Sequence, residues 1–178
     1  GEKCLLPFDA NINDEYSFFP LREFYLCLEK IQKMKQVQNI TIFMDVDFNN
    51  PAFEQNLAKL DLDKTGKKKK NKGKRNKKKG EKEPAIENEI KPPEGITAFF
   101  ASNINQLTYK HPDIDNGIFT YYLLKGLRGE ADNGDKSVTV AELHDFIMKN
   151  VQDTTSKLYS SMPQVPVLFT PDPNRVLY

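Results

Sequence analysis

Two aspartates follow a short apolar run near the middle of the chain, and they are the side chains best placed to do chemistry. Residues 40–50 read Ile-Thr-Ile-Phe-Met-Asp-Val-Asp-Phe-Asn-Asn. The apolar part is too short for an amphipathic helix and rich in β-branched residues, which predicts a buried parallel strand. Asp45 and Asp47 stand at its carboxyl end, where α/β sheets gather their chemistry. Because side chains alternate along a strand, both carboxylates should point to the same side.

The patterns around this strand alternate between helices and strands. Apolar residues recur at helical spacing after Pro20, where Leu28 and Ile31 are among those predicted to face the core, and again after the capping-box pattern from Thr139 to Glu142. Gly129 fits the C′ position of the helix predicted at 117–128. The predicted elements, in chain order, are an edge strand at 4–7, a helix from 20 to near 37, the central strand, a helix at 51–60, a strand at 95–102, helices at 117–128 and 139–151, and a last strand at 164–169. This order is typical of an α/β domain with a mostly parallel sheet. Because of Pro166, the last strand should either lie at the edge of the sheet or begin at this proline.

The length and cysteine content indicate one domain of an intracellular class. A chain of 178 residues can bury a hydrophobic core, and no apolar run approaches the roughly 20 residues of a membrane span. Cys4 and Cys27 lack metal-ligand spacing, so each is predicted to be a small buried apolar residue in a reducing compartment. We therefore expect a cytoplasmic protein, or else a nuclear or cytoskeletal one, with no metal, no cofactor and no membrane contact.

A strongly basic segment interrupts the predicted domain. Residues 64–82 hold 12 of the 26 Lys and Arg residues but one of the 25 acidic residues. The remainder, with 14 basic and 24 acidic residues, is therefore acidic. The stretch 64–93 is mostly Lys, Asn, Gly, Glu and Pro, a composition that cannot bury a core. It predicts a disordered, Lys-rich insert, which is tolerated because loop-closure entropy grows slowly with length.

The insert is most simply a solvated loop, but its charge also suits binding. It could contact an acidic protein surface such as tubulin tails, a nuclear-import receptor, or nucleic acid without sequence preference. It has no interleaved aromatic residues for stacking on single strands. The candidate partner-binding residues are Lys67, Lys68, Lys69, Lys70, Lys72, Lys74, Arg75, Lys77, Lys78 and Lys79.

Five local patterns, in the right order, resemble the caspase-like clan of cysteine peptidases, which includes caspases, metacaspases and their bacterial relatives. They are Leu5 to Ala10, similar to "LLPxDA"; the strand at 40–50, similar to the nucleophile strand; 117–124, similar to "GxFTxxLL"; 127–143, which continues it into a "VTxxEL" helix; and 164–166, similar to "QxP". The resemblance implies a three-layer caspase-like sandwich over residues 1–178, incomplete at its amino-terminal side, because half of the usual sheet would precede Gly1.

The departures from this family concern the catalytic residues. Asp47 occupies the position of the nucleophilic cysteine, and a carboxylate is a poor nucleophile toward an amide carbonyl. Asn49 and Asn50 replace the family's Ser-Gly. The family's catalytic histidine belongs to a strand upstream of this chain. Asp45 matches the aspartate that, in metacaspase-like members, lines the pocket for a basic substrate residue.

The resemblance therefore implies a catalytically inactive, pseudopeptidase domain that acts as a structural or protein-interaction module. Two alternatives stay open. The first is a working caspase- or metacaspase-type endopeptidase whose histidine half is missing here. The second is a Mg²⁺-dependent phosphatase, because an apolar strand ending in Asp-x-Asp also resembles the first motif of haloacid-dehalogenase-type enzymes. The two aspartates could also simply solvate a strand end. The insert occupies the position of the caspase processing linker, so it could be a substrate of a Lys- or Arg-specific relative.

Two other groups of residues invite a site but fit ordinary roles. The sequence Asp-Asn-Gly-Asp at 132–135 does not have the spacing of an EF-hand loop, so a turn capped by aspartate and glycine is predicted. His111, before a proline, and His144, on a polar helix face, are predicted to be surface residues.

Overall fold

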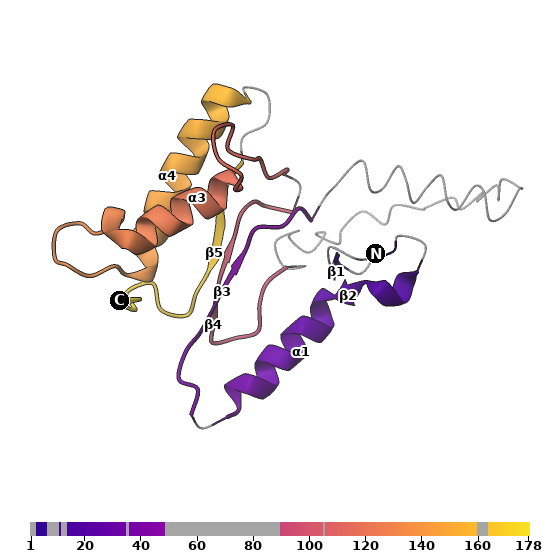
Figure 1. Cartoon of the computed structure of the whole chain (residues 1–178). Helices are drawn as coiled ribbons and strands as arrows, with labels where there is room; N and C mark the ends of the chain where they lie inside the picture. Colours follow the sequence, from indigo (N-terminus) through magenta and orange to yellow (C-terminus); the bar gives the residue numbers. More distant parts are fainter. Residues whose placement is uncertain are drawn as a thin grey trace, which may run out of the picture.

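The computed structural model describes residues 3–6, 11, 14–34, 36–48, 90–104, 106–159 and 164–178. The elements are β1 (Cys4–Leu5), the 3₁₀ turn η1 (Glu15–Ser17), β2 (Phe19–Pro20), α1 (Leu21–Gln32), β3 (Ile40–Met44), β4 (Ile96–Phe100), α3 (Ile118–Lys125), the π-helical turn η3 (Gly126–Glu130), α4 (Val140–Leu158) and β5 (Val167–Phe169) (Figure 1). The predicted helix at 51–60 and residues 64–89 of the insert lie outside the described residues.

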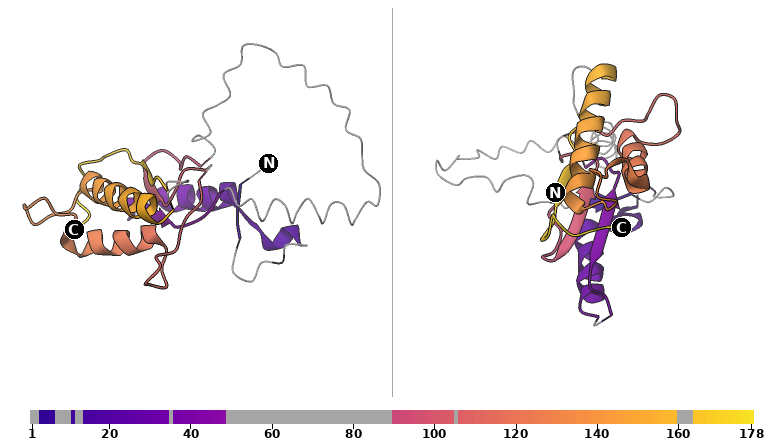
Figure 2. Two further views of the ribbon diagram at one scale, coloured as in Figure 1. Left: turned by 90° about the horizontal axis from the view of Figure 1, so that it is seen from above. Right: turned by 90° about the vertical axis from the view of Figure 1, so that its left-hand side faces the viewer.

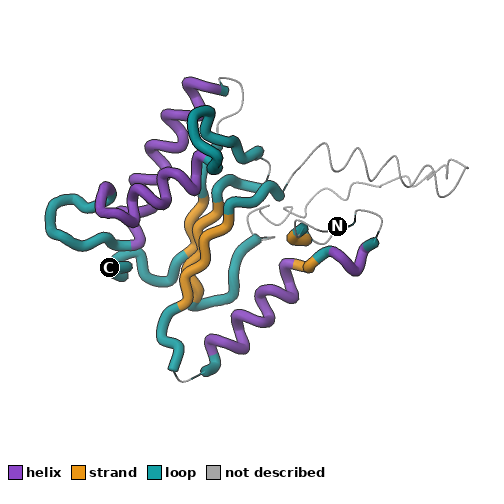
Figure 3. The backbone as a smooth tube through the Cα atoms, viewed as in Figure 1, coloured by secondary structure: helices purple, strands orange, loops and turns teal. Residues whose placement is uncertain are grey.

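The central sheet has the strand order β3-β4-β5 (Figure 3). Strands β3 and β4 are parallel, with Ile40 opposite Ile96, but β4 and β5 are antiparallel. The sheet is therefore mixed, and the prediction of a mostly parallel sheet is wrong for its last strand. The reason is the point at which the chain returns to the sheet before β5. Gln164 hydrogen-bonds Ala101 just beyond the carboxyl end of β4, so β5 must run back along β4. Strand β5 lies at the edge of the described sheet, which is one of the two placements predicted from Pro166.

Helices cover both faces of this sheet, and side-chain alternation along β4 explains how. All five residues of β4 are buried. Phe99 packs with residues of α3 and α4 in one core cluster. Ala98 and Phe100 pack with Leu21 of α1 in another. Figure 1 accordingly shows α1 on one side of the strands and α3 and α4 on the other, and the described elements form a layered α/β unit.

The C-terminal segment completes the start of α4. The predicted capping box is confirmed: the Glu142 N–H donates to Thr139 Oγ1 (3.2 Å), and the Thr139 N–H donates to Glu142 Oε2 (2.8 Å). The Val140 and Ala141 N–H groups donate to the carbonyls of residues 175 and 173, at 3.0 and 2.9 Å. Figure 2 shows the C-terminus near this end of α4. A helix start leaves its first N–H groups without partners in the helix, so residues 173–178 stabilise it directly.

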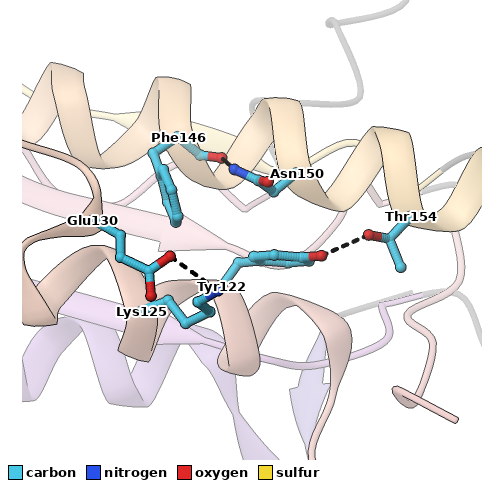
Figure 4. Close-up of polar contacts among 6 residues, drawn as sticks. All are labelled: Tyr122, Lys125, Glu130, Phe146, Asn150 and Thr154. Carbon is cyan, nitrogen blue, oxygen red and sulfur yellow. Dashed lines mark hydrogen bonds and ion pairs between the residues drawn. The ribbon is translucent and has the colours of Figure 1, made fainter. Parts of the chain in front are cut away.

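A polar contact joins α3 to α4 beside their shared core (Figure 4). The Tyr122 hydroxyl of α3 lies 2.8 Å from Thr154 Oγ1 of α4, while a 2.9 Å ion pair between Lys125 and Glu130 connects α3 to the π-helical turn. The predicted C′ role of Gly129 is consistent with its positive φ of 103°, although the helical run extends through the π-helical turn to Glu130 rather than ending at residue 128. The two helices thus pack as a unit.

The amino-terminal part corrects three predictions. Strand β1 is present and pairs with β2, as the edge-strand prediction requires. Cys27 is exposed rather than buried, and Ile31, predicted to face the core, is 39% exposed, because α1 has more apolar surface than the described sheet covers. Ile90, inside the predicted insert, is fully buried and accepts a hydrogen bond from the Tyr25 hydroxyl through its carbonyl. The insert therefore ends before residue 90.

Candidate functional site

The two aspartates predicted to do chemistry lie just beyond the carboxyl end of β3, and both have hydrogen-bond partners far away in the sequence. Asp47 Oδ1 accepts a bond from the Thr108 N–H at 2.6 Å. Asp45 Oδ2 accepts a bond from the Thr120 hydroxyl, also at 2.6 Å. Asp47 therefore holds the loop after β4, and Asp45 holds the start of α3. Short bonds of this kind are typical of ionised acceptors.

Asp45 supplies the N-terminal cap that α3 lacks in its own sequence. The N-cap residue of α3 is Gly117, which has no side chain to accept a bond. The carboxylate of Asp45 instead accepts a bond from the hydroxyl of Thr120, the third residue of the helix, and the nearby backbone of Thr120 also favours the charged form of Asp45. A negative charge at this end also interacts favourably with the helix dipole. The capping group thus comes from another strand rather than from the adjoining loop.

The position of the Asp45 carboxylate explains why residue 117 is glycine. A Cβ atom built on Gly117 would lie 2.2 Å from Asp45 Oδ2, well inside contact distance. The backbone of Gly117 has φ −60° and ψ 147°, which any residue can adopt. Close approach of the carboxylate, and not backbone conformation, therefore requires glycine here.

The surroundings of Asp45 raise its pKa above the usual value of an aspartate. The main cause is burial of the carboxylate, and the negative charge of Asp47 adds to it; the hydroxyl and the backbone of Thr120 act in the opposite direction. The residue as a whole keeps exposed surface, while its Oδ2 lies against Gly117 and Thr120 at the start of α3. Ionised Asp45 is thus held against a desolvation penalty by the donors at the helix start.

A buried glutamine organises the same edge of the sheet from the other side. Gln164 is fully buried. Its Nε2 donates to the Ala101 carbonyl at 2.8 Å, and its Oε1 accepts from the Tyr109 N–H at 3.1 Å. One side chain therefore connects the end of β4, the loop that follows it and the segment before β5. The sequence marked Gln164 as part of a family-like motif, but no local signal gave it this role.

Gln106, which lies earlier in the same loop, makes a similar set of bonds. Its Oε1 accepts from the Val165 N–H at 3.0 Å. The hydroxyl of buried Ser102 donates to the backbone carbonyl of Gln106 at 3.3 Å. Together with Asp45, Asp47 and Gln164, it makes the carboxyl edge of the sheet a network of side chains bound to backbone groups.

This network differs from the chemistry that the sequence allowed. One carboxylate oxygen of Asp45 is bound by the Thr120 hydroxyl at the start of α3. The cysteines stand on other elements, Cys4 on β1 and Cys27 on α1. Within the described part of the chain, no three His, Cys, Asp or Glu residues come together as a metal site. The arrangement as described stabilises loops and a helix start.

The histidines were predicted to be surface residues, and this is wrong for His144. Its side chain is 14% exposed, and its Nε2 is buried without a hydrogen-bond partner among the described residues. Burial lowers its pKa, and Asp145 and the Pro166 backbone partly oppose this. His144 therefore packs as a neutral ring between α4 and the segment before β5. His111 is half-buried and packs against Tyr121 at 4.8 Å between ring centroids.

The remaining candidates divide into one turn and one segment outside the described residues. Asp132 Oδ1 accepts from the N–H groups of Gly134, Asp135 and Lys136, at 2.7, 3.0 and 3.2 Å, which confirms the predicted capped turn. All ten basic candidates from Lys67 to Lys79, and Asn49 and Asn50, lie outside the described residues. No described helix is long and apolar enough to cross a membrane.

Comparison with known proteins adds no relative to this picture: no protein-family model, no curated protein and no solved structure matches the chain.

Proposed function

We propose that this chain is a caspase-like domain that does not hydrolyse peptides and acts as a structural or protein-interaction module. The observation that supports the proposal best is the bond from the Thr108 N–H to Asp47 Oδ1. The position that resembles the family's nucleophile carries a carboxylate, and this carboxylate anchors a loop. A carboxylate is a poor nucleophile toward an amide carbonyl, and one oxygen of Asp47 already holds backbone.

The second part of the proposal assigns the binding role to the basic segment. Residues 64–82 carry 12 basic residues and one acidic residue, next to a domain that is acidic in the rest of its sequence. A dense positive segment attracts a polyanionic surface through long-range charge interactions. We propose an acidic protein surface such as tubulin tails as the partner, with nucleic acid as a sequence-independent competitor.

The binding role is tested with poly-glutamate as the probe. A variant in which the 12 basic residues of 64–82 become glutamine keeps the length of the segment but removes its charge. It should lose retention on poly-glutamate, and native retention should fall steeply with added salt because the contact is electrostatic. A control with the same residues in shuffled order should bind like the native chain. Equal binding by the glutamine variant would assign the segment a spacer role.

The absence of catalysis needs separate assays for each alternative. Fluorogenic peptides with Lys, Arg or Asp before the scissile bond should not be cleaved, and a thiol-directed caspase-type probe should not label the native protein. Labelling would support the cysteine-peptidase alternative. Mg²⁺-dependent release of phosphate from p-nitrophenyl phosphate, lost in Asp45→Asn with the fold retained, would support the phosphatase alternative instead.

A further inference from the structure

The ring of His144 lies between α4 and the segment that leads into β5. Its Nε2 is buried, with no hydrogen-bond partner in the part of the chain that the structure describes. The backbone of Pro166, a buried residue of that segment, acts on the ring from the side opposite the helix. A neutral imidazole has one donor and one acceptor nitrogen, whereas a protonated ring has two donors. The position therefore suits the neutral ring.

The surroundings of His144 offer little compensation for a positive charge. The positions three and four residues away along α4, namely 140, 141, 147 and 148, are all apolar. Residues 160–171, which include the segment before β5 and β5 itself, contain no ionisable side chain. The acidic neighbour is Asp145, 3.5 Å from Nδ1, but its side chain is 84% exposed, so solvent screens its charge.

Two charged residues of the C-terminal segment also lie near the start of α4, and both make their described contacts elsewhere. Asp172 Oδ1 accepts from the Asn174 N–H at 3.0 Å. The Arg175 guanidinium donates to the hydroxyl of Thr41 on β3 at 2.5 Å. Asp145 is consequently the acidic group that faces a protonated His144 ring.

The segment beside His144 also organises the carboxyl edge of the sheet. Gln164 donates to the Ala101 carbonyl and accepts from the Tyr109 N–H, and the Val165 N–H donates to Gln106 Oε1. Pro166 follows directly and connects these two residues to β5. A movement of Pro166 away from α4 must move Val165 as well, so the packing of the His144 ring affects the loop that follows β4.

We propose that His144 is a pH-sensitive switch, whose protonation releases residues 164–166 from α4 and loosens the loop that follows β4. The proton comes from solvent, and no covalent bond changes. A charged ring must reach water, because the buried side of its site offers no second acceptor of its own charge type. As the ring turns outward, Pro166 loses the packing beneath it. Gln164 keeps a bond from its N–H to Thr155 Oγ1 on α4, so Val165 should respond more than Tyr109.

The direction of the pH dependence follows from the two states of the segment. Burial lowers the pKa of His144 in the closed state below the usual 6.5. The open state therefore binds the proton more readily, and opening becomes more favourable as the pH falls below 6.5. Between about pH 7.5 and about pH 5.5, the equilibrium constant for opening should rise by up to about tenfold.

Amide hydrogen exchange of the native chain, corrected for its intrinsic pH dependence, measures this opening. Protection of the Val165 amide should fall by up to about tenfold over the same pH range, with a smaller fall at Tyr109. Low concentrations of urea should hardly change exchange at these amides, because local opening exposes little surface, but should accelerate exchange at the core amides of Ala101 and Leu143. Unchanged Val165 protection would overturn the proposal. The same urea dependence at all four amides would overturn it too, because proton uptake would then accompany global unfolding.

Substitution of the two histidines identifies the group that takes up the proton. His144→Gln keeps a polar side chain but cannot be protonated, so protection of the Val165 amide should no longer depend on pH. His144→Leu provides a second variant without a titratable group if glutamine destabilises the buried position. His111→Gln removes the other histidine, which packs against Tyr121, and should retain the native pH dependence. If Val165 protection still falls with pH in both His144 variants, another group is responsible and the switch is refuted.

Discussion

Replacing Gly117 with alanine should destabilise the protein only when Asp45 is present. The added methyl group would lie 2.2 Å from Asp45 Oδ2, so the carboxylate must leave its position and lose its bonds with Thr120. Loss of an N-terminal cap costs about 1 kcal/mol, with a range of about 0.5–2. Relieving the clash adds a smaller strain. We expect Gly117→Ala to lower the free energy of unfolding by about 1–2 kcal/mol.

The result changes once the carboxylate is removed. In Asp45→Ala, the cap is already lost and the space beside Gly117 is open. Alanine is a poorer N-cap than glycine but restricts the unfolded chain more, and these effects nearly cancel. Gly117→Ala should therefore change the free energy of unfolding by less than about 0.5 kcal/mol in this background. The two substitutions should show a coupling energy of about 1 kcal/mol or more.

Urea unfolding of the four proteins, followed by far-ultraviolet circular dichroism, measures this coupling. Gly134→Ala provides the control. A Cβ at Gly134 meets no atom within 4 Å, but its φ of 114° strains any other residue. Its cost should therefore be equal with and without Asp45. If Gly117→Ala shows the same penalty in both backgrounds, the interaction between Asp45 and the helix start is not what requires glycine, and the capping argument fails.

Three further predictions concern the groups that hold the carboxyl edge of the sheet and the start of α4. The lowered pKa of His144 means that the unfolded chain binds its proton more readily, so the free energy of unfolding should fall as pH drops below 6.5; a pH series of urea melts should show a smaller decline in His144→Gln. Gln164→Met should destabilise by about 3 kcal/mol, because the buried Ala101 carbonyl and the Tyr109 N–H both lose their bonds with Gln164, and an unchanged urea midpoint would contradict its role. Deleting residues 173–178 should lower the free energy of unfolding by more than about 2 kcal/mol, since it removes two acceptors at the start of α4, the backbone bonds with Val138 and the packing of Leu177 on the core, and it should increase amide exchange in the first turn of that helix.

The sequence predicted best those features that depend on neighbouring residues. The capping box from Thr139 to Glu142 is visible because both partners lie within four positions. The buried strand β4 is visible because an apolar run bounded by glycine and serine has few other interpretations. The positive φ of Gly129 follows from its place after a helical pattern. In each case the chemical signal and its structural consequence occupy the same short window.

The features that the sequence did not reveal depend on distant contacts. Asp45 and Thr120 are 75 positions apart, and Gln164 and Ala101 are 63 apart, so no pattern in a short window connects them. Periodicity likewise shows which face of α1 is apolar but not how far a neighbour covers it. This explains why the exposure of Ile31 and Cys27 was not predicted from the sequence. The direction of β5 also depended on where Gln164 attaches, a tertiary contact.

The structural work of the two aspartates limits what position 47 can do chemically. A group that attacks a carbonyl or binds a metal must offer a lone pair to the carbonyl carbon or to the metal ion. The carboxylate of Asp47 uses one of its oxygens on the Thr108 N–H, and that of Asp45 accepts a bond from the Thr120 hydroxyl. Releasing either group would free a loop or a helix start that nothing else described at this edge holds in the same way. The same residues that suggest an active site in the sequence therefore act as determinants of stability. A loss of binding in an Asp45 or Asp47 variant would identify a contact with a partner only if the free energy of unfolding of that variant were preserved.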